Sequence, residues 1–167
     1  MRTLFHLFWQ ICLLRQSPAA VPANGAFVGI VVLANLVCSV AVSRGFGSEQ
    51  SLLTTATGII VGQAATAALV WFALYGSGKP ERFVTTITAM FGCDLIITAC
   101  FSLLIPVTAT AGATVSGVIL LLFMVWSVTV AGFILHRAMQ IRFGMAVALA
   151  LGISLFSVII GQTAIGA

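Results

Sequence analysis

Charged residues are scarce in this chain: Asp, Glu, Lys and Arg together make up 6% of its 167 residues, and only three residues are acidic. Soluble globular domains carry about 25% charged residues, so the composition excludes an ordinary soluble domain. Apolar residues account for 61% of the sequence, and its mean hydropathy is +1.22. These values predict an integral membrane protein.

Motifs for catalysis, metal binding or redox chemistry are missing as well. The sequence has no GxSxG, no HExxH, no glycine-rich phosphate loop and no acidic pair. His6 and His136 lack a third ligand at a suitable spacing. The cysteines form no CxxC pair and are typical of small packing residues: Cys12, Cys38, Cys93 and Cys100. We therefore expect a protein that is not an enzyme and that holds no metal and no cofactor.

Five apolar stretches are each long enough to cross a hydrocarbon core of about 30 Å, which needs about 20 residues per helix. They cover about residues 25–42, 51–75, 83–105, 115–135 and 145–165. The connectors are too short for a separate soluble domain, so we predict a single all-α, polytopic transmembrane domain over residues 25–165. Pro106 is expected to end the third span, and residues 108–114 are expected to form an outer loop.

Residues 1–16 are apolar but too short to span the membrane. Thr3, His6 and Gln10 recur at helical spacing, and apolar side chains occupy most of the remaining helix surface. This pattern predicts an amphipathic helix in the cytoplasmic interface of the membrane. A cleaved signal peptide is the alternative, but Arg15 crowds the region where cleavage would occur.

The basic residues are divided unevenly between the two sides of these spans. Six of the seven lie on one side: Arg2, Arg15, Lys79, Arg82, Arg137 and Arg142. Only Arg44 lies on the other side. Because Lys and Arg in short loops stay in the cytoplasm, we expect a cytoplasmic N-terminus and a periplasmic or extracellular C-terminus. A net charge of +4 suggests nucleic acid in a soluble protein. Here the cations flank spans, so we expect membrane lipids as partners and no nucleic acid.

Each span carries one polar residue near its midpoint: Asn35, Gln63, Asp94, Ser127 and Ser154. Such residues are costly in a membrane unless they are satisfied, and we expect them to form one polar layer in the bundle. Asp94 is the only ionisable residue well inside a span. It is either a proton or cation site, with Asn35 and Gln63 as neutral ligands, or part of a hydrogen-bonded clasp between helices. A partner chain that satisfies Asp94 is a third possibility.

Small residues spaced four apart predict close helix packing in three spans. They are Gly25 and Gly29 in the first span, Gly58 and Gly62 in the second, and Gly144, Ala148 and Gly152 in the fifth. Three arginines on the basic side are candidates for contacts with lipid headgroups: Arg15, Arg137 and Arg142.

The order of elements resembles that of the small bacterial members of the Yip1-like family of membrane proteins. The matching residues are Leu13-Leu14-Arg15 with Pro18 and Pro22 before the first span, and Ile134-Leu135-His136-Arg137-Ala138 after the fourth. The resemblance implies a multi-pass fold and a non-enzymatic role in organising membranes or partner proteins. It assigns no site residues.

The sequence supports three functional hypotheses. The first is a non-enzymatic protein of the bacterial inner membrane that acts through helix–helix contacts. It would be an accessory subunit or assembly factor of a larger complex, with other integral membrane proteins or further copies of itself as partners. The second is a small transporter or channel subunit with a midplane proton or cation site at Asp94. The third is a lipid-binding module built on the basic connectors around Arg137 and Arg142. Wet surroundings of Asp94 favour the second hypothesis over the first, and dry surroundings favour the first.

Overall fold

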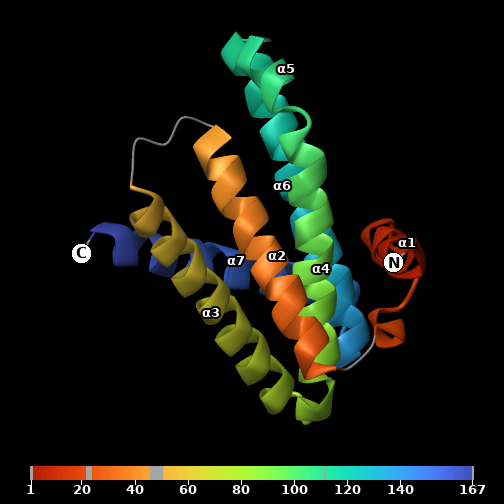
Figure 1. Ribbon diagram of the computed structural model, residues 1–167. Helices are drawn as coiled ribbons and strands as arrows, with labels where there is room; N and C mark the ends of the chain where they lie inside the picture. The colour runs from red at the N-terminus through yellow and green to blue at the C-terminus, as the bar shows by residue number, and fades with distance from the viewer. Residues whose placement is uncertain (1, 22–23, 46–50, 111, 167) are drawn as a thin grey trace.

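The computed structural model describes residues 2–21, 24–45, 51–110 and 112–166. All regular secondary structure in these ranges is helical. Five helices are long and apolar enough to cross a membrane (Figure 1): α2 (Gly25–Gly45), α3 (Leu52–Gly76), α4 (Phe83–Ser102), α6 (Gly112–Met139) and α7 (Phe143–Gly166). The prediction of an all-α, polytopic fold with five transmembrane helices is therefore confirmed, and the chain is a multi-pass membrane protein.

The segment after the third span differs from the expected loop. The prediction of an outer loop over residues 108–114 is wrong, because α5 (Ile105–Thr110) is helical and α6 begins at Gly112. Pro106 stands at the second position of α5, where its missing N–H breaks no helical hydrogen bond. Ser116 Oγ donates to Thr108 O at 2.7 Å, which ties α5 to the start of α6. Elsewhere the ends of the spans differ from the expected ends by four residues at most.

The amphipathic N-terminal segment forms α1 (Arg2–Cys12), which packs beside α4 (Figure 1). Phe8 and Cys12 are buried in this contact. Gly92 on α4 makes room for the Phe8 ring, since a Cβ at that position would stand 2.4 Å from Phe8 Cε1. Trp126 Nε1 of α6 donates to Cys12 O at 3.0 Å. Because Gly92 lies near the middle of α4, the helix α1 lies alongside the spans rather than beyond their ends.

Glycines allow α3 and α7 to pack closely along each other. A Cβ at Gly58 would stand 2.3 Å from Ile165 Cδ1, and a Cβ at Gly161 would stand 2.9 Å from Gly58 O. A Cβ at Gly62 would stand 3.4 Å from Ser157 O. Such close approach of backbones drives helix association in lipid, where the hydrophobic effect does not. Gly58 and Gly62, two of the expected packing residues, therefore lie at a helix interface.

The two ends of the bundle differ in how they are closed. We call the end that carries the connectors 77–82 and 140–142 the basic end, and the end where α2 stops and α3 starts the opposite end. Near the basic end the spans converge on an apolar cluster: Val70, Leu74, Ile87, Leu135, Ala146 and Ala150. Figure 1 shows α3 diverging from α4 and α6 toward the opposite end. The apolar cluster therefore holds the bundle together at the basic end.

Two cations from the turn between α3 and α4 cap the last turn of α6. Lys79 Nζ donates to Met139 O at 3.0 Å and to Gln140 Oε1 at 2.7 Å. Arg82 Nη1 donates to Ala138 O at 3.1 Å. Because the carbonyls at a helix C-terminus carry partial negative charge, these contacts are favourable. They tie the end of α6 to the start of α4.

Replacing Gly161 with Val is expected to lower the free energy of unfolding by about 1 to 3 kcal/mol, the cost of forcing a side chain into packed space. The added Cβ would meet Gly58 O, which belongs to a helical backbone and has little freedom to move. The unfolding midpoint in detergent, followed by circular dichroism, measures the loss. Gly152→Val on the same helix is the matched control, because no described atom of a neighbouring element lies within 4 Å of its Cβ position. Equal losses in the two variants would contradict this packing.

Candidate functional site

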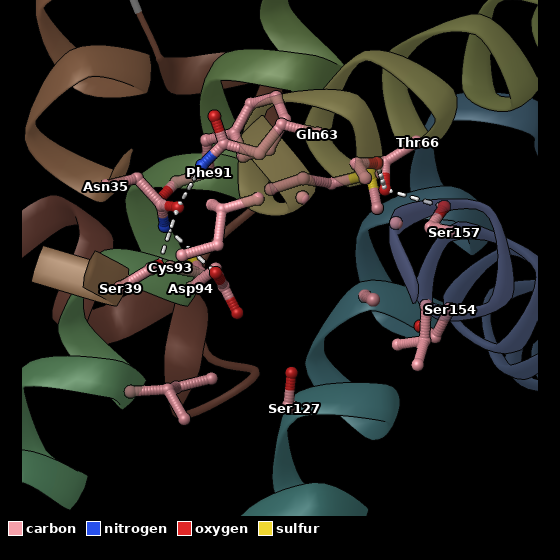
Figure 2. Close-up of a pocket in the computed structure, with 18 of the residues that line it drawn as sticks. Asn35, Ser39, Gln63, Thr66, Phe91, Cys93, Asp94, Ser127, Ser154 and Ser157 are labelled. Atoms are coloured by element: carbon pink, nitrogen blue, oxygen red, sulfur yellow. Dashed lines mark hydrogen bonds between the residues drawn. The ribbon is translucent and has the colours of Figure 1, made fainter. Parts of the chain in front are cut away.

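A cavity of about 460 Å³ lies between the five spans, and each span contributes to its wall (Figure 2). All five polar residues expected near the midpoints of the spans line it: Asn35, Gln63, Asp94, Ser127 and Ser154. The five polar residues thus lie around an open space and do not pack directly against one another as a single layer. A water molecule needs a cavity of only about 10 to 15 Å³, so this cavity has room for several waters beside Asp94.

Asn35 of α2 joins three helices through its side-chain amide. Its Nδ2 donates to Asp94 Oδ2 at 2.9 Å and to Phe91 O at 3.2 Å, both on α4. Its Oδ1 accepts from Gln63 Nε2 of α3 at 2.7 Å and from Ser39 Oγ at 3.5 Å. The amide thus uses both donors and both lone pairs, and Asn35 is 1% exposed. Asn35 is therefore the centre of a hydrogen-bonded clasp between α2, α3 and α4.

The Asp94 carboxyl is shared between the clasp and the cavity. Oδ2 accepts the hydrogen bond from Asn35, whereas Oδ1 has no hydrogen-bond partner among the residues that the structure describes. The side chain is half-buried and lines the cavity, and Figure 2 shows it pointing inward. None of the described residues in the wall is Lys, Arg or His. Oδ1 is therefore available to a proton, a water molecule or a cation inside the cavity.

Ser127 of α6 and Ser154 of α7 lie across the cavity from the clasp (Figure 2). No hydrogen bond between described residues joins either hydroxyl to Asn35, Gln63 or Asp94. The structure therefore brings all five expected residues to one cavity, but only three of them form a network. The two serines contribute polar surface to the facing wall, where a bound solute can reach them.

Further polar residues of the wall were missed by sequence reasoning. Ser39 and Ser43 follow Asn35 at intervals of four residues and so lie on the same face of α2. Thr66 Oγ1 donates to Ser157 Oγ at 2.8 Å across the interface between α3 and α7. The four-residue spacing in α2 was a usable signal. The pairing of Thr66 with Ser157 depends on which faces of two helices meet, and spacing within one helix does not show this.

The cavity extends toward the opposite end of the bundle. Its wall reaches Ser43 near the end of α2, Thr55 in the first turn of α3, and Ile165 in the last turn of α7. These three positions all lie at the opposite end. Near the basic end, the apolar cluster fills the space between the same helices. The cavity therefore extends from Asp94 toward the opposite end, whereas apolar side chains pack the space toward the basic end.

The remaining expected packing residues do not lie at a helix interface among the described residues. No described atom of a neighbouring element lies within 4 Å of the Cβ positions of Gly25, Gly29, Gly144 and Gly152, and Ala148 is exposed. Gly132, which sequence reasoning missed, instead faces Val147 of α7, whose Cγ2 lies 2.6 Å from where a Cβ would stand. The small-residue pattern thus predicted that Gly58 and Gly62 lie in a close helix contact, without naming α7 as the partner, and it missed the contact between α6 and α7.

The arginines expected at lipid headgroups, Arg15, Arg137 and Arg142, are all exposed. The Arg137 guanidinium lies 5.4 Å from the centre of the Phe133 ring, within range of a cation–π contact. Among the described residues, no group of three or more His, Cys, Asp or Glu side chains is placed to hold a metal ion.

Comparisons with known protein families, with curated proteins and with solved structures find no match to this chain. Three properties of the cavity matter most: Asp94 is the one carboxyl among its described wall residues, an amide clasp holds that carboxyl, and the cavity extends from it toward the opposite end.

Proposed function

We propose that this chain is a small membrane carrier, or a subunit of one, that binds a proton or a small cation at Asp94. The observation that carries this proposal is the position of Asp94 Oδ1, which faces a cavity large enough for water and has no partner among the described residues. A clasp that served only to hold helices together would need no such cavity. An ionisable residue inside a membrane is expensive, and its usual use is in an ion or proton pathway.

The neighbours of Asp94 fit this role. Asn35 donates to Asp94 Oδ2 and is itself held by Gln63. Both are neutral, so they fix the carboxyl without adding a charge that would compete with a cation. Ser127 and Ser154 on the facing wall offer hydroxyl oxygens in place of part of a cation's hydration shell. A carrier exposes its site to one side of the membrane at a time. Release at the basic end would then require the apolar cluster to separate, which makes this cluster the inner gate of the proposed carrier.

The distribution of basic residues supports an orientation for the carrier. Six of the seven Lys and Arg residues flank the spans on one side, and such residues stay in the cytoplasm. We place the chain in a bacterial inner membrane with its N-terminus in the cytoplasm and its C-terminus in the periplasm. In this orientation the cavity receives its solute from the periplasmic side.

A non-enzymatic role in organising other membrane proteins is the second candidate. The observation that favours it is the open space beside Gly25 and Gly29 on α2, and beside Gly144 and Gly152 on α7. Small residues spaced in this way permit close contact with a helix of another chain. The resemblance to Yip1-like proteins supports the same role. A purified protein that runs only as a monomer in mild detergent, with no partner, would contradict it.

Ser39→Cys is expected to react with a membrane-impermeant maleimide added from the side that carries the C-terminus. Water in the cavity supports the thiolate, which is the reactive form. Val37→Cys on the same helix is the matched control, because Val37 is 63% exposed but lies outside the cavity wall and so faces lipid. The protein is labelled in sealed vesicles, and the adduct is measured by intact mass. The unsubstituted protein, which has four cysteines of its own, gives the background labelling. Labelling of Ser39→Cys from the other side, or equal labelling of both variants, would contradict a one-sided aqueous cavity.

A further inference from the structure

A second cavity, of about 540 Å³, lies at the basic end. Its walls come from three segments: the turn that contains the 3-10 helix Pro18–Ala20, the first turn of α4 and the last turn of α6. The polar residues that matter for what it can bind are Ser17, Arg82, Thr85, His136, Arg137 and Gln140. We call it the basic-end cavity. It is separate from the cavity that contains Asp94, and no residue lines both.

The basic-end cavity is rich in hydrogen-bond donors. Arg82 uses only Nη1 for contacts with the described protein atoms, which leaves most of its five N–H donors for a ligand. Arg137 contacts the Phe133 ring, and no hydrogen bond of its guanidinium to a described residue is formed. The Thr85 hydroxyl also lines this cavity and has no partner among the described residues. Two full positive charges and a hydroxyl therefore surround the same space.

Two kinds of group near the basic-end cavity could repel an anion: the carbonyls at the end of α6 and the carboxylate of Glu81. The C-terminal carbonyls of α6 would repel an anion, but Ala138 O accepts from Arg82 and Met139 O accepts from Lys79. None of the described residues in the wall is acidic. Glu81, in the adjacent turn, is exposed and does not line the cavity.

The start of α4 adds a further attraction for anions. No side chain caps this helix at its first residue. The 3-10 turn Pro80–Arg82 runs into this helix, and Pro80 O accepts from the N–H of Phe83, so that N–H is not free. The positive end of the helix dipole nevertheless attracts anions such as phosphate. Thr85 and Thr86, in this first turn, line the basic-end cavity. The helix terminus and the two guanidinium groups therefore act on the same volume.

We propose that the basic-end cavity binds a phosphate group, held by Arg137, Arg82 and the first turn of α4. Planar guanidinium groups match the geometry of phosphate oxygens, which favours Arg over other cations at such sites. The cavity lies at the ends of α4 and α6, the level at which lipid headgroups meet a span. Both an anionic phospholipid headgroup and a soluble phosphate ester carry the chemistry that this site recognises.

Arg137→Gln is expected to weaken phosphate binding by about tenfold or more, since a hydrogen bond to a charged group contributes about 1.5 to 3 kcal/mol. The purified full chain in detergent is titrated with sn-glycerol 3-phosphate and, separately, with phosphatidylglycerol. The rise in the unfolding midpoint with ligand concentration gives an apparent Kd for each. Arg142→Gln is the matched control, because it removes the same charge from the same end of the bundle but lies outside the cavity wall. Thr85→Val is the second variant, should Arg137→Gln fail to fold.

The results of these titrations separate the two sources of phosphate. Stabilisation by both ligands, lost in Arg137→Gln and kept in Arg142→Gln, supports a phosphate site open to either source. Stabilisation by phosphatidylglycerol alone assigns the site to a lipid headgroup, and stabilisation by glycerol 3-phosphate alone assigns it to a soluble ester. No stabilisation by either ligand, or equal weakening in Arg137→Gln and Arg142→Gln, would overturn the proposal. None of these results depends on Asp94, so the carrier proposal stands or falls separately.

Discussion

Asp94→Asn is expected to reduce proton or cation uptake by the reconstituted protein to the level of protein-free vesicles, with little change in its unfolding midpoint. Asn has nearly the same shape as Asp, and its Oδ1 can take the place of Asp94 Oδ2 as acceptor for Asn35 Nδ2, 2.9 Å away. The clasp is then kept. The group facing the cavity becomes an NH₂, which neither titrates nor attracts a cation.

Uptake is measured in proteoliposomes, with a pH-sensitive dye for protons and with a cation-sensitive dye under an imposed gradient. Asp94→Glu keeps the charge and is expected to retain part of the uptake. Ser102→Ala, on the same helix but outside the cavity wall, is the control for a change that leaves the site intact. Unaltered uptake in Asp94→Asn would refute the carrier proposal. Loss of uptake together with a large fall in the unfolding midpoint would instead assign Asp94 to the clasp.

The sequence could predict at which level of the membrane each polar residue of the site lies. Each residue adds about 1.5 Å of rise, so counting from the ends of the apolar stretches placed Asn35, Gln63 and Asp94 at a similar level. In the structure Asn35 forms hydrogen bonds with both Asp94 and Gln63, which links the three side chains. Counting could not show that Ser127 and Ser154 stand apart from them. That outcome depends on how far α6 and α7 lie from α2 and on how each helix is rotated about its axis.

Chain ends and connectors were harder to predict, because several roles suit the same residues. Pro106 was interpreted as the end of a span, although proline is equally suited to the first turn of a helix, and it lies in the first turn of α5. Lys79 and Arg82 were assigned to topology alone. Their additional role as caps on α6 depends on the proximity of the two turns at the basic end. Packing of α1 on Gly92 likewise depends on a contact between distant parts of the chain.

Asn35→Leu is expected to lower the free energy of unfolding by about 2 to 5 kcal/mol, because hydrogen bonds between membrane helices contribute about 0.6 to 1.7 kcal/mol each and three are lost. Leucine has a similar size, so the loss comes from hydrogen bonding rather than from a cavity. Gln63 Nε2, Asp94 Oδ2 and Phe91 O would each lose the partner that Asn35 provides. The unfolding midpoint in detergent measures this, with Ser127→Ala expected to change stability by less than about 0.5 kcal/mol.

Comparing Asn35→Leu with Asp94→Asn separates two roles of the polar residues: holding the helices together and binding the solute. In Asn35→Leu the carboxyl is still present, but Asp94 Oδ2 is no longer held, so the side chain can turn within the cavity. We therefore expect Asn35→Leu to lose stability and to keep some uptake, and Asp94→Asn to show the reverse. If Asn35→Leu were as stable as the unsubstituted protein, the hydrogen bonds of Asn35 would contribute nothing to helix packing. The amide would then serve only to orient the Asp94 carboxyl.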